Sequence, residues 1–194
     1  AANGTGTGTI LDDDQPDVAL VNATVTEGGN ANFTVNLYLP GTTTPTTGAY
    51  PITVNFSVAN GTAMAGSDYT IPGTLSITII PGTPTGTITV ATIDDIIDET
   101  DTENFTVTLT TATNATVVAA TATGTATLND NDLPPDVAIG NAAAITEGGT
   151  SSFTVSLYQP GTSVLHTSGK TVTVNFSVAN GTATSGSDYT IPGT

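Results

Sequence analysis

The stretch "TVNFSVANGTAMAGSDYTIPGT" at residues 53–74 returns almost unchanged as "TVNFSVANGTATSGSDYTIPGT" at residues 173–194. A second stretch, "TEGGNANFTVNLYLPGT" at residues 26–42, returns as "TEGGTSSFTVSLYQPGT" at residues 146–162. In both cases the second copy begins 120 residues after the first. A repeat of this length has the size of an independent domain, which buries roughly 65% of its unfolded-chain surface in a core of its own. The repeats therefore predict tandem domains.

A shorter repeated segment marks the predicted boundary between one repeat and the next. The segment "GTILDDDQPDVAL" at residues 8–20 resembles "ATLNDNDLPPDVAI" at residues 126–139. We therefore expect a piece of a longer chain, with repeats joined by proline-stiffened linkers such as "LPP". The expected pieces are the last strand of a preceding repeat (1–15), a complete repeat (16–133) and the N-terminal half of the next repeat (134–194).

Apolar and polar residues alternate along several short runs, as in Phe33, Val35 and Leu37 with polar residues between them. Such alternation is typical of strands with one buried face. The runs are residues 33–37, 52–58, 75–79, 88–90 and 105–109, and residues 115–128 are predicted to form one long strand. Turn residues separate the runs, and no segment has a helical period. The pattern predicts an all-β chain of tandem antiparallel β-sandwiches with about seven strands per repeat.

The composition excludes several classes of function. Acidic residues outnumber basic ones 17 to 1, which gives a formal net charge of −16. Such a chain has no basic patch for nucleic-acid phosphates or anionic membrane surfaces, and no apolar run long enough to insert into a membrane. It has no Cys, and its one His, His166, lies outside the complete repeat, so no Ser-His-Asp triad can form there. We therefore expect no enzymatic activity.

The carboxylates of the complete repeat are predicted to lie in loops and at strand ends. The densest cluster, "DDIIDETDTE" at residues 94–103, holds six acids in ten residues, and no Lys or Arg of the repeat balances them. Like charges this close repel one another and destabilise the compact state. A hard divalent cation, above all Ca²⁺, would relieve the repulsion, and Asp94 and Asp130 could meet at one end of the sandwich. The alternative is a solvated acidic loop that aids solubility.

Several motifs together resemble a Calx-beta domain, the calcium-binding module of sodium–calcium exchangers, integrin β4 and many large bacterial surface proteins. The motifs are "VTEGG" (25–29), "FTVNL" (33–37), "VNFSVANGTAMAGSDYT" (54–70), "GTLSITIIPG" (73–82), "TITVATIDDIIDETDTENFTVTL" (87–109) and "GTATLNDND" (124–132). The resemblance implies an immunoglobulin-like sandwich that binds calcium through loops at one end.

Carried over by position, the resemblance also implies a set of calcium ligands. In the complete repeat they are Glu27, Asp68, Asp94, Asp95, Asp98 or Glu99, Glu103, Asp130 and Asp132, with a backbone carbonyl from Ile96 or Ile97. Asp12, Asp13 and Asp14 would belong to the site of the preceding repeat, and Glu147 and Asp188 to that of the next. Asn129 and Asn131 interrupt the closing acidic run, and a neutral amide donates less charge, which would lower the number of bound ions.

The first interpretation of function is a calcium-stabilised structural repeat of an extracellular fibre, stalk or adhesin shaft, with Ca²⁺ rigidifying the junctions between domains. Its partners would be neighbouring repeats of the same chain and other copies in a fibre. Near-identical copies favour this interpretation, because spacers tolerate copying whereas sensors diverge. One alternative is a calcium-sensing regulatory module of a larger membrane protein. Another is a surface- or glycan-binding adhesion module, although the absence of Trp argues against sugar stacking.

Three further expectations concern single residues. Asn60, in the sequon Asn-Gly-Thr on a turn, is the best candidate for a glycan. His166 and Lys170 are expected to be variable surface residues, because their loop differs between the two copies. Tyr69 and Tyr189 are expected to pack beside the metal site rather than to form a binding platform.

Overall fold

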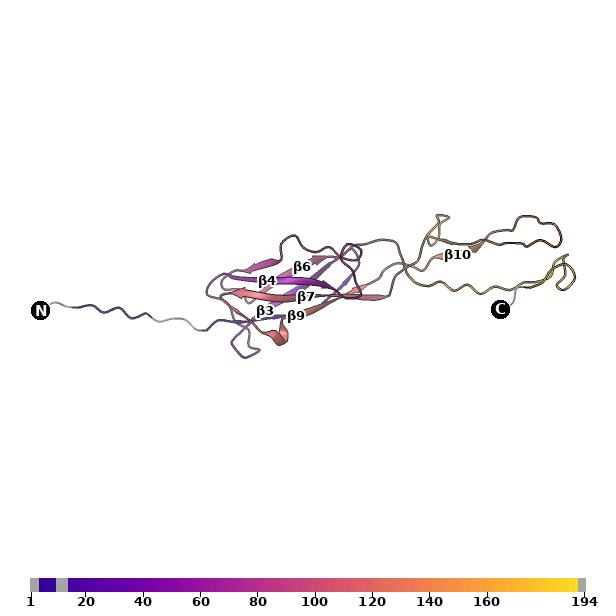
Figure 1. Ribbon diagram of the computed structural model, residues 1–194. Coiled ribbons are helices and arrows are strands. Elements are labelled where there is room, and N and C mark those ends of the chain that lie inside the picture. The colour runs from indigo at the N-terminus through magenta and orange to yellow at the C-terminus, as the bar shows by residue number, and fades with distance from the viewer. Residues whose placement is uncertain (1–3, 10–13, 192–194) are drawn as a thin grey trace. The chain divides into compact units, whose positions relative to one another are not determined.

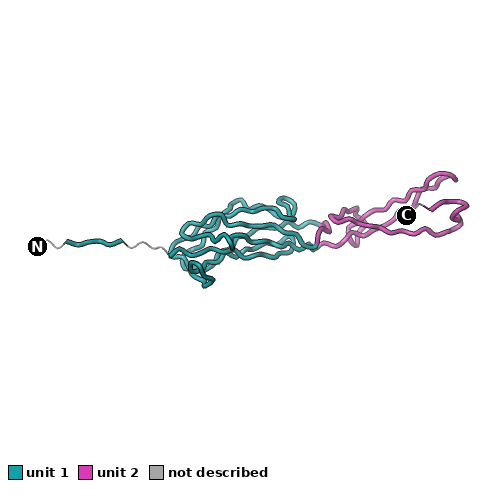
Figure 2. Tube along the Cα trace, turned by 60° about the horizontal axis from the view of Figure 1, so that its bottom comes forward, with its two compact units in different colours: residues 1–95, 101–131 teal, residues 96–100, 132–194 magenta. Residues whose placement is uncertain are grey.

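The computed structural model describes residues 4–9 and 14–191, and their secondary structure is almost entirely β (Figure 1). The chain divides into two compact units (Figure 2). The first unit comprises residues 1–95 and 101–131, and the second comprises residues 96–100 and 132–194. The predicted ends of the repeats stay a prediction, and each unit is described below by itself.

In its described residues, the first unit contains nine strands and one short 3-10 helix. They are β1 (Asp17–Leu20), β2 (Ala23–Thr26), β3 (Asn30–Tyr38), β4 (Ile52–Asn60), β5 (Ser76–Ile79), β6 (Thr85–Ala91), β7 (Thr102–Thr113), β8 (Thr116–Val117), η1 (Ala119–Thr121) and β9 (Thr123–Asn129). A four-stranded sheet has the order β6-β3-β1-β8, and a five-stranded sheet has the order β2-β9-β7-β4-β5. The two sheets confirm the predicted β-sandwich.

Two features of the sheets were not predicted from the sequence, and the second departs from the expected antiparallel pairing. The first strand is split, because β1 pairs with β3 in one sheet while β2 pairs with β9 in the other. Asn22, between them, accepts a hydrogen bond from the Thr125 N–H at 2.9 Å through Oδ1. The pairs β1–β8 and β2–β9 are parallel, whereas the other strand pairs of this unit are antiparallel.

The predicted long strand over residues 115–128 is wrong, because this segment crosses between the sheets. Asn114 has φ +61° and starts a turn, after which β8 pairs with β1. The chain then passes through η1 before β9 pairs with β7. Leu75 was also expected to face the core, but it precedes β5 and is exposed. Alternation alone does not show where a chain changes sheets.

The core lies between the two sheets and is built from the alternating residues. Its largest fully buried side chains are Tyr69, Phe33, Phe105, Leu37, Ile52, Ile88, Val18, Val35, Val54, Val90 and Val107. Tyr69 stacks on Phe105 with ring centroids 4.1 Å apart, and Phe33 meets the edge of Phe105 at 6.0 Å. Such aromatic pairs add to the free energy gained from burial alone. Tyr69 is therefore a packing residue, as the sequence predicted.

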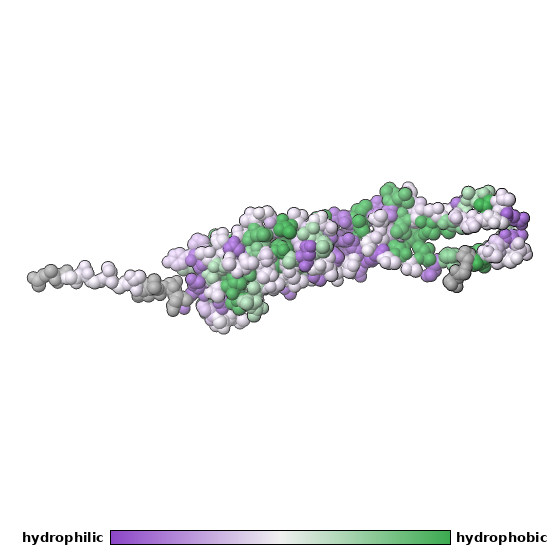
Figure 3. Space-filling view, in the orientation of Figure 1, coloured by the Kyte–Doolittle hydropathy of each residue, from purple (hydrophilic) through white to green (hydrophobic). Residues whose placement is uncertain are grey.

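The described part of the second unit contains one hairpin, formed by β10 (Asp136–Ile139) and β11 (Val155–Tyr158). Asp136 lies opposite Tyr158, the same register as Asp17 opposite Tyr38 in β1 and β3. Residues 172–180, the copy of β4, are in no strand of the described chain. Apolar surface gathers over this unit (Figure 3).

Candidate metal centre

The turn after β2 carries Glu27 and packs against the segment that follows β6. Gly28 has φ +73°, which favours glycine, and a Cβ on it would lie 2.9 Å from the Cβ of Asp94. The Gly29 carbonyl accepts hydrogen bonds from the Thr92 N–H at 2.9 Å and from the Thr92 hydroxyl at 3.0 Å. Glycine in this turn therefore lets the turn pack closely against the start of the acidic loop, residues 94–103.

The loop that follows β4 is closed by its own polar side chains. Asn60 Oδ1 accepts hydrogen bonds from the Ala65 N–H at 3.0 Å and from the Tyr69 hydroxyl at 2.6 Å. Buried Asp68 accepts a hydrogen bond from the Met64 N–H through Oδ2. Burial, and secondarily the negative charge of Asp68, raise the pKa of Tyr69 above its ordinary value, so Tyr69 stays a neutral donor at neutral pH. The glycan expected on Asn60 stays a prediction.

The first carboxylate pair joins this loop to the start of β7. The Ile93 N–H donates to the Asp68 carbonyl at 2.9 Å, so Asp68 lies beside the start of the acidic loop. Carboxylate oxygens of Asp68 and Glu103 lie within 4.8 Å of each other. The other acid of this group, Glu99, stands four residues before Glu103 in the chain. Glu103 lies inside a strand, contrary to the sequence expectation, because β7 pairs with β9 from its first residue.

The second carboxylate pair joins the turn after β2 to the end of β9. The Glu27 N–H donates to the Asn129 carbonyl at 3.1 Å and holds the two segments side by side. Carboxylate oxygens of Glu27 and Asp130 lie within 4.8 Å of each other. The other acid of this group, Asp132, stands two residues after Asp130. All the acids of both groups were predicted from the sequence.

Other predicted ligands lie nearby without joining these groups. Asp94 Oδ1 accepts a hydrogen bond from Asn131 Nδ2 at 3.3 Å. The predicted meeting of Asp94 with Asp130 is not part of either group; Asp94 instead accepts a hydrogen bond from Asn131, the residue after Asp130. Asp95 belongs to neither group, and the role of the Ile97 carbonyl stays a prediction.

Among the described residues, the acids predicted for the neighbouring repeats join neither carboxylate group. Asp12 and Asp13 lie outside the described residues, and Asp14, Glu147 and Asp188 belong to neither group. Asp188 Oδ2 accepts hydrogen bonds from the Thr184 N–H at 2.7 Å and from the Thr184 hydroxyl at 3.0 Å. These hydrogen bonds lower the pKa of Asp188 below its ordinary value. Asp188 thus closes its own loop, as Asp68 does.

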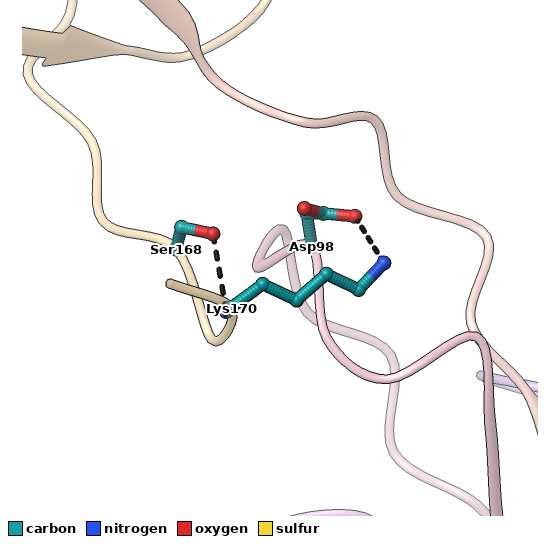
Figure 4. Close-up of polar contacts among 3 residues, drawn as sticks. All are labelled: Asp98, Ser168 and Lys170. Carbon is teal, nitrogen blue, oxygen red and sulfur yellow. Dashed lines mark hydrogen bonds and ion pairs between the residues drawn. The ribbon is translucent and has the colours of Figure 1, made fainter. Parts of the chain in front are cut away.

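Asp98, predicted as an alternative ligand to Glu99, forms an ion pair within the second unit (Figure 4). Lys170 Nζ lies 2.8 Å from Asp98 Oδ1, and only 5% of Asp98 is exposed. The Gly169 N–H donates to the Asp98 carbonyl at 3.0 Å, and the Lys170 N–H donates to Ser168 Oγ at 3.2 Å. A buried carboxylate is stable when a cation lies this close. Asp98 therefore has a counter-ion.

His166 and Lys170 lie in the variable loop, as predicted, but both make contacts that the sequence did not predict. Lys170 stands where the first copy has Tyr50, so the sequence difference places the only Lys or Arg of the chain beside Asp98. His166 is half-buried, and its backbone N–H donates to the Leu157 carbonyl at 3.0 Å. The sequence signal for this ion pair was Lys170 itself, the one Lys or Arg in a chain that has 17 acidic residues.

The donor set of both groups consists of carboxylate oxygens alone. Oxygen-only sites suit hard cations such as Ca²⁺, which takes six to eight oxygens at about 2.3–2.6 Å, whereas Zn²⁺ favours His and Cys. Backbone carbonyls and water would complete the coordination. The residues present therefore fit calcium.

The first unit is thus a β-sandwich in which two groups of carboxylates form candidate metal-binding sites. The sequence model of the Calx-beta domain matches residues 12–132 and 146–192, and the chain belongs to this family. Calx-beta domains are calcium-binding modules. No curated protein matches the chain.

Several solved structures are similar to the chain. The apo-form Calx CBD1 domain is 19% identical with a TM-score of 0.49, and the match covers 61% of this chain and 100% of that one. CBD12 from CALX1.2 is 20% identical with a TM-score of 0.48, covering 69% and 53%. The Calx CBD2 domain is 9% identical with a TM-score of 0.48, covering 62% and 91%. Among the described residues, no helix is both long and apolar enough to cross a membrane.

Proposed function

We propose that the chain binds Ca²⁺ through the loops at one end of the first sandwich. The supporting observation is the convergence of carboxylates from separate parts of the sequence, Glu27 with Asp130 and Asp68 with Glu103. Backbone hydrogen bonds hold the segments that carry each pair side by side. The Glu27 N–H donates to the Asn129 carbonyl at 3.1 Å, and the Ala63 N–H donates to the Asn104 carbonyl at 2.8 Å. A bound dication relieves their mutual repulsion.

The role we propose is that of a structural repeat in an extracellular fibre, stalk or adhesin shaft. The near-identity of residues 53–74 and 173–194 supports this role, because a spacer can be copied without loss of function. Calcium bound before the linker 133–135 would restrict the angle between neighbouring repeats. Extracellular calcium is millimolar, so a dissociation constant of about 10⁻⁴–10⁻³ M is sufficient.

Calorimetric titration and thermal denaturation in calcium or in EDTA test this proposal. At a calcium concentration 100 times the dissociation constant, the free energy of unfolding rises by about 2.7 kcal/mol. Glu103→Gln is expected to reduce this gain, because it removes one charge from a pair. Asp17→Asn is the matched control: it removes the same charge from β1, and its side-chain oxygen can still accept the Gly41 N–H bonded to Asp17 at 2.7 Å.

Four outcomes are informative. Melting that calcium and EDTA do not change would overturn the proposal, as would an equal loss of calcium response in Glu103→Gln and Asp17→Asn. A dissociation constant near 10⁻⁷–10⁻⁵ M would instead support the regulatory sensor. Small-angle scattering that gives one shape with and without calcium would contradict the proposed stiffening of junctions.

A further inference from the structure

The middle of the acidic loop contacts a loop in which the two copies of the repeat differ. Both sides of this contact, residues 96–100 and residues 162–171, lie in the second unit. Residues 162–171 are "TSVLHTSGKT", whereas their copy at residues 42–51 is "TTTPTTGAYP". The stretches that follow these loops are almost identical in the two copies. The sequence difference therefore falls on the loop that makes the contact.

Two of the differences create the contact. Gly169 stands where the first copy has Ala49, and a Cβ on Gly169 would lie 3.2 Å from the Asp98 carbonyl oxygen, closer than an ordinary van der Waals contact. The absence of a Cβ lets the Gly169 N–H donate to that carbonyl at 3.0 Å. Lys170 stands where the first copy has Tyr50, and its Nζ lies 2.8 Å from Asp98 Oδ1 (Figure 4). Alanine and tyrosine would supply neither the close approach nor the charge.

The adjacent acids Asp98 and Glu99 have different surroundings. Asp98 is 5% exposed, and both its carbonyl and its carboxylate are bonded to residues 169–170. Glu99 belongs to one of the two carboxylate groups found among the described residues, and Asp98 belongs to neither. A carboxylate that is paired with an ammonium group is a poor calcium ligand, because Ca²⁺ would first have to separate the pair. The loop thus offers one acid to a metal and holds the other.

We infer that Lys170 is a resident counter-ion that reserves Asp98 for anchoring the acidic loop and leaves Glu99 as the acid available to calcium. The resemblance to the family offered these two acids as alternative ligands. The Asp98–Lys170 pair forms with or without calcium, so residues 96–100 stay anchored to residues 162–171 when calcium leaves. The role of Glu99 rests on the proposed calcium function, whereas the anchoring pair does not.

Hydrogen exchange of the Gly169 amide, followed by NMR in the 194-residue chain, tests the anchor. We expect the same rate in EDTA and in about 10 mM Ca²⁺, which is at least tenfold above the proposed dissociation constant. In Lys170→Met the exchange should be on the order of tenfold faster in both conditions. The combined change Gly169→Ala and Lys170→Tyr restores the first-copy residues and should also remove the protection. The Asp188 N–H, which donates to the Thr184 carbonyl at 2.9 Å, is the internal reference and should not change.

Calorimetric calcium titration tests the division between the two acids. Asp98→Asn combined with Lys170→Met removes the ion pair without changing the net charge. This variant should bind calcium within about twofold of the parent affinity, because no calcium ligand is lost. Glu99→Gln removes a ligand and should weaken binding on the order of tenfold. Lys170→Arg keeps the positive charge and is the matched control, with the calcium affinity of the parent.

Three results would overturn the inference. Faster exchange of Gly169 on addition of calcium would show that calcium displaces Lys170 from Asp98. Equal exchange in the parent and in Lys170→Met in EDTA would show that the pair anchors nothing. A loss of calcium affinity in the charge-neutral double variant as large as in Glu99→Gln would make Asp98 a ligand. A parent chain that binds no calcium would refute the proposed function and the role of Glu99, and the exchange in EDTA would then decide the anchor alone.

Discussion

Replacing the same phenylalanine in each copy of the octapeptide should have very different effects on stability. Phe56 in β4 is 5% exposed and lies opposite Leu109 of β7, whereas Phe176 is 71% exposed. Truncating a buried phenylalanine to alanine leaves a cavity and costs about 3–5 kcal/mol. Truncating an exposed side chain usually changes stability by less than about 0.5 kcal/mol. We therefore expect Phe56→Ala to destabilise the first unit strongly and Phe176→Ala to leave it unchanged.

Urea denaturation followed by far-UV circular dichroism measures this difference. With a slope of about 2 kcal/mol per molar urea, Phe56→Ala should lower the midpoint by roughly 2 M. The stability of a domain is about 5–15 kcal/mol, so the loss is a large fraction of the total. The two variants have the same composition, which makes each the control for the other. Equal shifts in both would refute the conclusion that only the first copy is buried.

The remaining predictions concern the two polar contacts of the second unit. Lys170→Met should speed hydrogen exchange of the Gly169 N–H, which donates to the Asp98 carbonyl, because buried Asp98 loses its counter-ion. Lys170→Arg should restore the protection. Unchanged exchange in Lys170→Met would contradict the ion pair. Thr184→Ala should raise the pKa of Asp188 towards its ordinary value of about 3.9, because the hydroxyl donor is lost. Because the folded pKa is lowered, Asp188 stabilises its loop above pH 3.9 or so and loses this effect as the pH falls through the folded pKa. An NMR titration of the Asp188 carboxyl that is unchanged in Thr184→Ala would refute this assignment.

Much of the candidate site could be predicted from the sequence, because its acids stand in motifs that resemble a Calx-beta domain. Glu27 lies in the Gly-rich turn before the alternating run 33–37, and Asp130 lies in the acidic stretch 129–132 that precedes the linker. The pairing of Asp98 with Lys170 was not predictable in this way. It joins residues 72 positions apart through loops, and no periodic pattern fixes how a loop is placed. The single strand predicted over residues 115–128 was wrong for a related reason, because strand propensity does not show where a chain changes from one sheet to the other.

The sequence by itself determined the structures whose hydrogen bonds are local. The loop from Asn60 to Asp68 and its copy from Asn180 to Asp188 close in the same way, through the same asparagine and aspartate acceptors, although only one belongs to a complete sandwich. Only the tertiary structure decided the state of "TVNFSVAN", which is a strand at residues 53–60 and not at residues 173–180. The physical reason is that a strand takes its hydrogen-bond partners and its apolar cover from other parts of the chain.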